Sequence, residues 1–443
     1  MKNDLTSGVI WKQVLWFFIP VVIGAFFQHL YTIVDTIIVG KGLGTIELAA
    51  VGGSASKLIV MITNFFIGIS SGITAYASIS YGEKNYYKLK SIIYNGLVLF
   101  VPLGIIISIL GFLFSNNFLV MMKTPTDTID LANIYLKTYL AGILFCVIYN
   151  TFAGVLRAMG DTKRPLYVLL FCSIVNITLD ILLALVFQMG VFGVALATVI
   201  SQALSALILA IILVKTLKST GDYKCRINLQ EIKQISIIGI PAGIQSMMFS
   251  LSNMAVQGAV NSFSTVSVAA WTAYVKLDSI VDVVVSSLSN TVIPFVGQNI
   301  GAKNYRRAKQ SVNQIILISY AIIATLTVIF MLNRVFLLSL FTNDFEVVKI
   351  ASKLIFIIMP MYLLTIPQQM FSQALRAKGK SFFPMVLTLV GVVGFRVFWV
   401  YFVLPQNQSL ILLAACYPIS AFIMSVIFTV YYKSEINKED IVQ

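Results

Sequence analysis

The sequence predicts an all-α polytopic membrane protein with twelve transmembrane helices in two six-helix lobes. Charged residues make up only 11% of the 443 residues and apolar residues 58%, whereas soluble domains carry about 25% charged residues. Two separate sequence patterns also recur at a single offset of 219 positions. A duplicated, apolar chain of this kind is typical of transporters, whose working site lies between the two halves.

The two repeated patterns lie in polar stretches between apolar runs. LRAxG followed by a proline occupies 156–165 and recurs at 375–384. GxKNYxxxK begins at Gly82 and recurs from Gly301. Because both share one offset, we infer that a whole half was duplicated, and six spans per half make this a parallel repeat. We therefore expect an N-lobe over 1–218 and a C-lobe, with the linker, over 219–443.

Each apolar stretch is long enough to cross a bilayer as a helix, which takes about 20 residues. The expected spans are 14–40, 50–80, 92–114, 133–156, 166–187, 191–215, 236–262, 267–297, 312–338, 350–375, 384–404 and 409–432. The longest polar segment, 216–235, is the expected linker. Pro20 interrupts the first span and Pro241 the seventh. Proline removes a helical hydrogen bond, so we predict a fixed kink or a hinge at Pro20.

The distribution of Lys and Arg predicts the orientation. Of the 31 basic residues, 22 fall in the two tails and in alternate loops. Such an excess marks the cytoplasmic side, so both termini should be cytoplasmic, in the plasma membrane of a bacterial cell. The same scatter excludes a nucleic-acid-binding face and favours contact with membrane lipids. The cysteines, scattered and mostly in apolar runs, are expected to be small packed residues: Cys146, Cys172, Cys225 and Cys416.

Three helices of the first half carry polar residues to one depth. Asp35 lies roughly 8 Å below the outer end of the first span, and Asp180 and Thr198 roughly 10 Å below it in spans five and six. Asn176 shares a helix face with Asp180, and Gln28 and Tyr31 continue the polar stripe of Asp35. Oxygen groups in one layer can hold a hard cation such as Na⁺, or a proton. The alternative is that each Asp only hydrogen-bonds a neighbouring helix.

The second half lacks these carboxylates. Trp399 stands at the position equivalent to Asp180, and Phe395 at that of Asn176. The seventh span instead carries an uncharged polar face: Ser246, Ser250, Asn253 and Gln257. Asp278 and Arg396 fall at similar depths, so they form either a structural ion pair or part of a substrate site. The predicted substrate cavity comprises Gln28, Tyr31, Ser250, Asn253, Gln257, Asp278 and Arg396.

Several segments together resemble the multidrug and toxic compound extrusion (MATE) family. They are VDTIIVG at 34–40 after Pro20, Gln28 and Tyr31, LRAxGDTKRP at 156–165, NxxxD at 176–180, GVALAT at 193–198 and FVGQNIGA at 295–302. The resemblance implies a twelve-helix antiporter that exports bulky, often cationic organic compounds in exchange for Na⁺ or H⁺ by alternating access. It needs no cofactor, and we expect a monomer.

The resemblance also assigns residues. Asp35, Asn176, Asp180 and Thr198 match the family's N-lobe cation site, and Gln28 and Tyr31 match its neighbours. Ser250 stands where some members carry an acid on helix 7, and 356–375 holds no acid. A C-lobe Na⁺ site of that type is therefore not expected in this chain.

Other functions fit the sequence less well. A flippase for lipid-linked saccharides of the same superfamily is the alternative, but its cavity needs several cations, and only Lys57, Lys276 and Arg396 are available. An intramembrane enzyme needs a nucleophile with a base, or a metal cluster, and one histidine with scattered cysteines supplies neither. A channel needs a ring of filter groups, which two lobes with few charges do not form.

Overall fold

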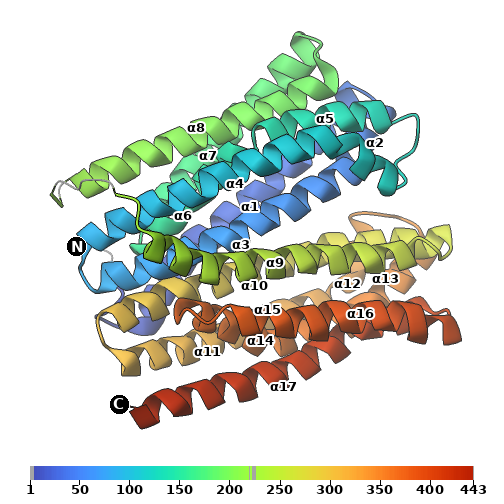
Figure 1. Ribbon diagram of the computed structural model, residues 1–443. Helices are drawn as coiled ribbons and strands as arrows, with labels where there is room; N and C mark the ends of the chain where they lie inside the picture. The colour runs from blue at the N-terminus through green and yellow to red at the C-terminus, as the bar shows by residue number, and fades with distance from the viewer. Residues whose placement is uncertain (1–3, 219, 222–225, 443) are drawn as a thin grey trace.

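The computed structural model describes residues 4–218, 220–221 and 226–442, and this part of the chain contains helices and no strand. Figure 1 shows the helices running side by side in two groups. The first half contains α1 (Ile10–Gly42), α2 (Thr45–Gly52), α3 (Ser54–Gly82), α4 (Tyr86–Met121), α5 (Ile129–Ala141), α6 (Ile143–Ala158), α7 (Lys163–Asp180), η1 (Ile181–Val186) and α8 (Gly190–Lys218).

The second half repeats this order. It contains α9 (Leu229–Val260), α10 (Thr265–Gly301), α11 (Tyr305–Leu332), α12 (Arg334–Ser339), α13 (Phe345–Ile358), α14 (Met361–Ala377), α15 (Phe382–Thr388), η2 (Leu389–Gly394), α16 (Phe395–Phe398), η3 (Trp399–Val403), η4 (Leu404–Gln406) and α17 (Leu410–Val442).

Ten helices of the described chain are long and apolar enough to cross a membrane, and two bent pairs bring the number to twelve. The pairs are α5–α6, bent by 47°, and α13–α14, bent by 44°. Their breaks, at Gly142 and at Met359–Pro360, fall at nearly equivalent places of the repeat. The prediction of twelve spans is therefore confirmed if each bent pair counts as one span, and the bend is part of the duplicated unit.

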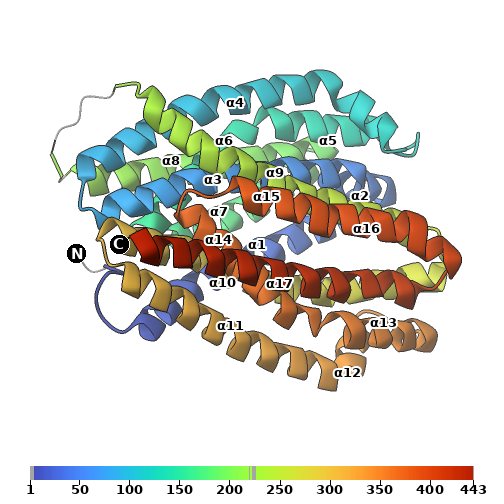
Figure 2. The same ribbon diagram turned by 60° about the horizontal axis from the view of Figure 1, so that its bottom comes forward.

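The two halves meet along α3, which packs on both α9 and α10. Gly72 of α3 lies so close to Gly239 of α9 that an added Cβ would come within 2.7 Å of the Gly239 nitrogen. Gly68 approaches the backbone of Ala242 and Gly243 equally closely. Small residues let helix backbones come into contact in a membrane, so these glycines bring the two lobes together. Figures 1 and 2 show the lobes in contact near the end that holds both termini.

That end also carries polar links between the lobes. The Gln298 side chain of α10 donates to the Ala158 carbonyl at the end of α6 (2.7 Å) and accepts from the Leu5 amide (3.1 Å). Glu231 at the start of α9 accepts from Ser91 and Asn95 of α4, at 2.6 and 2.9 Å. The structure therefore has the lobes joined at the end that holds the termini (Figure 2).

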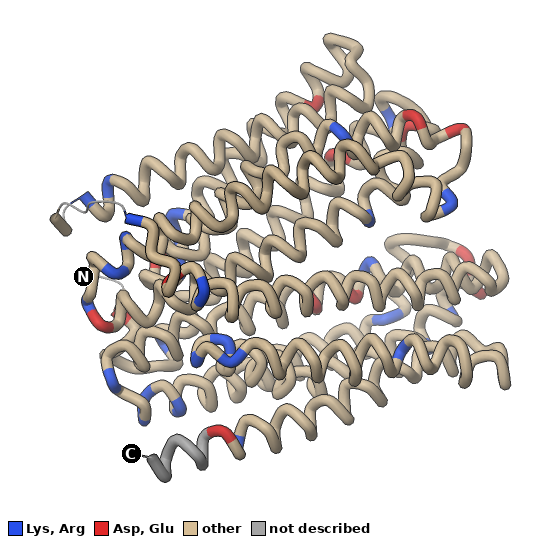
Figure 3. Tube along the Cα trace, viewed as in Figure 1, with Lys and Arg blue, Asp and Glu red and all other residues tan. Residues whose placement is uncertain are grey.

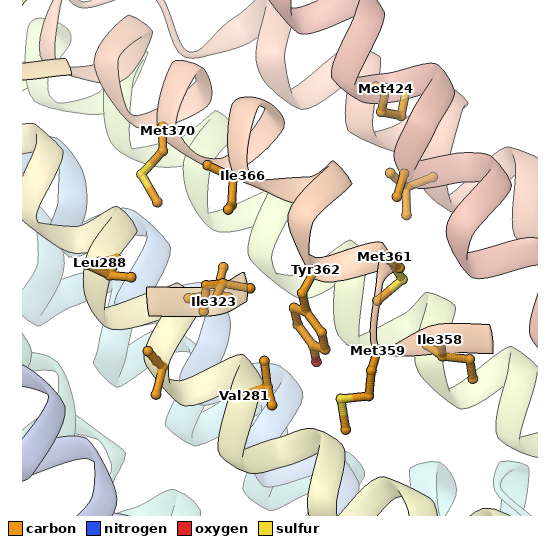
Figure 4. Close-up of a cluster of buried hydrophobic side chains, with 14 of the residues drawn as sticks. Val281, Leu288, Ile323, Ile358, Met359, Met361, Tyr362, Ile366, Met370 and Met424 are labelled. Atoms are coloured by element: carbon orange, nitrogen blue, oxygen red, sulfur yellow. The ribbon is translucent and has the colours of Figure 1, made fainter. Parts of the chain in front are cut away.

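Most buried apolar side chains form one core per lobe. Figure 4 shows part of the second-half core, where the Tyr362 ring lies among apolar side chains that include Val281 and Met359. The first helix belongs to both halves. Its opening turns, including Val14 and Phe17, pack into the C-lobe core, whereas Val39 near its other end packs into an N-lobe cluster. Ala75 of α3 also lies in the second-half core and Ile235 of α9 in the first-half core, so each core includes residues from the other half, and the boundary at 218 stays a prediction.

The linker is shorter than the sequence analysis predicted. Residues 216–218 belong to α8, and α9 begins at Leu229 because the Asn228 side chain accepts from the Gln230 and Glu231 amides and caps the helix. The predicted segment 216–235 was therefore too long at both ends. Cys146, Cys172 and Cys416 are free and buried, as expected, whereas Cys225, Lys2 and Lys224 lie outside the described residues.

Candidate functional site

The centre of the candidate site is a pair of carboxyl groups from two helices. Asp180 ends α7 and is 0% exposed, and Asp35 of α1 is half-buried. The two side chains lie within hydrogen-bonding reach of one another. Two carboxylates are both acceptors, so they approach this closely only when a proton or a cation lies between them. The structure thus places the two predicted residues close together, and their role in holding a cation or a proton stays a prediction.

Several buried polar atoms around the pair have no hydrogen-bond partner among the described residues. They are Asp35 Oδ1, both Asp180 oxygens, and both polar atoms of the Asn176 side chain, one turn earlier on α7. A buried polar group without a partner is rare and costly, and it points to an ion, a proton or water. Carboxylate and amide oxygens fit a hard cation such as Na⁺, and a carboxyl pair fits a proton equally well.

Thr198 of α8 is buried, but its hydroxyl donates to the Val194 carbonyl of its own helix at 3.1 Å. The hydroxyl oxygen keeps lone pairs that can still accept a bond or ligate a cation. No hydrogen bond joins Thr198 to Asp35 or Asp180, so its role as a fourth ligand stays a prediction.

The backbone changes directly after Asp180. Residues Ile181–Val186 form a π-helix, and in the second half Trp399–Val403 do the same. Trp399 stands at the repeat position of Asp180, and its indole donates to the Leu412 carbonyl at 2.9 Å. π-Helical turns often occur at functional sites. Both halves thus have the backbone distortion, but only the first half has the carboxyl group.

Tyr135 of α5 lies beside the carboxyl pair and was not predicted from the sequence. Its phenol lies close enough to Asp35, Asp180 and Tyr31 to interact with them electrostatically. One turn on, Tyr139 accepts a hydrogen bond from Gln202 of α8 at 3.0 Å. These tyrosines are neutral, so they do not stand out as charged residues in an apolar span. Their spacing of four residues on a membrane helix is the signal that could have found them.

In the second half, the structure does not form the suggested ion pair between Asp278 and Arg396. Asp278 accepts from the Tyr274 hydroxyl at 2.7 Å, and its backbone carbonyl accepts from Tyr362 at 3.3 Å. Arg396 donates to Asn253 at 3.1 Å and lies over the Tyr417 ring, 4.2 Å from its centroid. Each charge has closer partners, so no salt bridge joins them, although they still interact electrostatically at longer range.

The remaining predicted cavity residues are spread along the helices. Ser250 accepts from Asn64 of α3 at 2.9 Å, which links the two lobes. Gln257 donates to Asn261 at 3.0 Å. Gln28 is exposed and Tyr31 is half-buried on α1. Of the predicted cavity residues, Asn253 is hydrogen-bonded to Arg396. No hydrogen bond joins Gln28 or Gln257 to Asp278 or Arg396.

The described part of the chain has two similar lobes, up to twelve helices that are long and apolar enough to span a membrane, and buried carboxyl groups inside those helices. These features are typical of a membrane transporter of the two-lobe class. The MatE family model matches residues 20–182 and 241–402, one copy in each lobe. The chain therefore belongs to the MATE family. The two matches begin at Pro20 and Pro241, the two prolines in the first helix of each lobe.

Similar proteins agree over nearly the whole chain. "Probable multidrug resistance protein YoeA" of Bacillus subtilis (strain 168) is 30% identical over 98% of this chain and 95% of its own length. "Multidrug export protein MepA" of Staphylococcus aureus (strain NCTC 8325 / PS 47) is 24% identical over 84% of this chain and 82% of its own length. A solved MATE family transporter in an outward-facing conformation has the same fold, with 22% identity, a TM-score of 0.89, and coverage of 99% of this chain and 98% of its own.

Proposed function

We propose that this MATE transporter is a secondary antiporter, which exports bulky, often cationic organic compounds in exchange for Na⁺ or H⁺. The observation that carries the proposal is the Asp35–Asp180 pair with its unpartnered oxygens. When a coupling cation or proton occupies the pair, it neutralises the charge. When the site is empty, two carboxylates repel one another across α1 and α7. Binding of a cation or a proton at the pair therefore lowers the energy of packing α1 against α7, and its release favours a different position of α1.

The position of α1 supports alternating access as the mechanism. Its start packs on the C-lobe and its far end on the N-lobe, and Pro20 lies within the part that contacts the C-lobe. Proline leaves the carbonyl four residues before it without a helical partner, so the helix bends most easily there. The helix is continuous through Pro20 in this structure. A bend at Pro20 would let the ion site at Asp35 act on contacts between the lobes.

Substrate recognition in the second half is supported by its mixed chemistry. Asp278 supplies a negative charge, and Trp271 and Tyr274 supply aromatic rings beside it. Aromatic faces and a carboxylate suit organic cations. Relatives named for multidrug resistance or multidrug export support the proposed outward direction of transport. The flippase alternative is less well supported, because Asp35, Asp180 and Asp278 would repel a pyrophosphate group.

The test uses purified protein in liposomes and a fluorescent organic cation. Uptake is measured under a Na⁺ gradient alone and under a H⁺ gradient alone, with no ATP present. We expect one of the two gradients to drive transport against the substrate gradient. A response that needs ATP, or no response to either gradient with correctly inserted protein, would refute the antiporter proposal.

A further inference from the structure

A shallow groove lies at the end of the C-lobe opposite the termini, where α12, α13 and α17 meet. It has a volume of about 460 Å³, and its lining is Arg334, Ser352, Lys353, Phe356, Ile357 and Ile411. Two of these six side chains are cations, one is a hydroxyl and three are apolar, and none is an acid. None of these six residues is among those assigned above to ion coupling or substrate binding. We propose that it binds an anionic phospholipid, with the headgroup phosphate between Arg334 and Lys353.

The cation Arg334 is held in place by the protein. Its Nε donates to Ser352 at 2.8 Å and its Nη1 to the Met331 carbonyl at 2.6 Å, while the guanidinium lies 6.0 Å from the centroid of the Phe356 ring. These contacts use Nε and Nη1 and leave Nη2 for a ligand. A fixed guanidinium suits phosphate, because its planar array of donors matches the phosphate oxygens.

The nearby acids on α13 are occupied elsewhere. Asp344 caps the helix by accepting from the Glu346 and Val347 amides at 2.9 and 3.3 Å. Glu346 pairs with Lys349 at 3.3 Å. Lys353 is exposed and has no ion pair with any described residue. The groove therefore has two cations without a carboxylate to neutralise them, and a negatively charged ligand complements it.

The apolar surface around the groove distinguishes a lipid from a free anion. Phe356 and Ile411 are exposed at 58% and 44%, and they form the apolar part of the groove wall. Beside them, the chain around α12 exposes further large apolar side chains: Leu332, Val335, Phe336, Leu340, Phe341 and Phe345. Such a surface suits the acyl region of a bilayer, and the adjoining cations then lie at headgroup level. An amphiphile with a phosphate head fits both parts.

The position of Arg334 and Lys353 is also unusual for this chain. Figure 3 shows most Lys and Arg near the end that holds the termini, and a smaller number at the other end. Cations that oppose the general bias are not explained by membrane orientation. A local ligand explains why two of them share one groove.

The experiment measures the thermal stability of detergent-purified protein while phosphatidylglycerol is added. Phosphatidylcholine with the same acyl chains tests the charge, and inorganic phosphate tests the acyl contribution. We expect phosphatidylglycerol alone to raise the Tm in a saturable way. Lys353→Gln should weaken this apparent affinity roughly five-fold, since a cation near an anionic lipid contributes about 1 kcal/mol.

Lys123→Gln is the matched control, because Lys123 is an exposed cation at the same end of the molecule but in the N-lobe. Arg334→Gln should act like Lys353→Gln. If that variant does not fold, Lys353→Gln decides alone, because Lys353 has no ion pair to lose. Equal stabilisation of wild type and Lys353→Gln overturns the proposal. Stabilisation by phosphatidylcholine or by inorganic phosphate as strong as that by phosphatidylglycerol also overturns the assignment to an anionic lipid.

Discussion

Gly82 of α3 and Gly301 of α10 pack reciprocally against the backbone of each other's helix. A Cβ on Gly82 would collide with the Gln298 carbonyl, and one on Gly301 would collide with the Ile79 carbonyl. Gly82 and Gly301 are equivalent in the repeat, and so are Ile79 and Gln298, both at the offset of 219. The contact is therefore symmetric between the lobes, and it joins them at the end that holds the termini.

We predict that Gly82→Ala separates the lobes at this end. The added methyl group collides with backbone atoms, which cannot rotate away. The packing of α3 on α10 should therefore lose about 1–3 kcal/mol of stability. The expected result is slower transport and greater labelling of a cysteine placed at Ile79. Gly258→Ala on α9 is the control, because nothing lies within 4 Å of its added Cβ. Alanine favours a helix over glycine by about 1 kcal/mol, and the Gly258→Ala control accounts for this gain in both variants. If Gly82→Ala transports as fast as Gly258→Ala, the tight symmetric contact is contradicted.

We predict that Asp35→Asn abolishes gradient-driven transport in a folded protein. The asparagine amide can donate a hydrogen bond to Asp180, so the packing of α1 on α7 should persist. It cannot release a proton or neutralise a cation, so coupling should be lost. Transport under a Na⁺ or H⁺ gradient measures the effect, and gel filtration measures folding.

Asp127→Asn is the control for this substitution. Asp127 is an exposed acid in the loop between α4 and α5, and its loss should leave transport near the wild-type rate. If Asp35→Asn transports as fast as Asp127→Asn does, Asp35 only supports the packing of α1.

The sequence was sufficient to predict the duplication and the number of spans, and it put Asp35 and Asp180 at similar depths. These features follow from apolar run length, the repeat offset and helix rise, which are local properties. Tyr135 and the bends at Gly142 and Met359–Pro360 were not predicted. A neutral tyrosine and a bend inside an apolar run do not change the charge, so a search for charged residues and long apolar runs does not detect them.

The suggestion of an ion pair between Asp278 and Arg396 shows a further limit. Equal depth was read from residue counts, but depth does not give the direction of a side chain around its helix. Tyr274 and Tyr362 on one side, and Asn253 with Tyr417 on the other, bind the two charges separately. Such partners are polar or aromatic residues in apolar runs, and only the packed structure identifies which of them lie within reach.

The structure leads to a specific expectation for this pair. Removing one partner of a direct buried ion pair costs about 3–5 kcal/mol, and removing the second then restores stability. Because Asp278 and Arg396 have separate partners, we expect the effects of Asp278→Ala and Arg396→Met on unfolding to add, within about 0.5 kcal/mol. Thermal or denaturant unfolding of the two single variants and the double variant measures the coupling. Recovery of stability in the double variant would show that Asp278 and Arg396 form an ion pair after all.

The last prediction concerns orientation, on which the direction of export depends. Lys218 ends α8 at the end that holds the termini, and Asn343 lies in the loop between α12 and α13 at the other end. The excess of Lys and Arg lies at the first of these ends (Figure 3), and such an excess is retained in the cytoplasm. A reporter fused after Lys218 should therefore be cytoplasmic, and one inserted at the exposed Asn343 should be extracellular. Alkaline phosphatase and green fluorescent protein fusions give opposite signals on the two sides, so each position is tested twice. Reversed signals at both positions would show that the protein has the opposite orientation in the membrane. The proposed direction of transport would then be reversed as well.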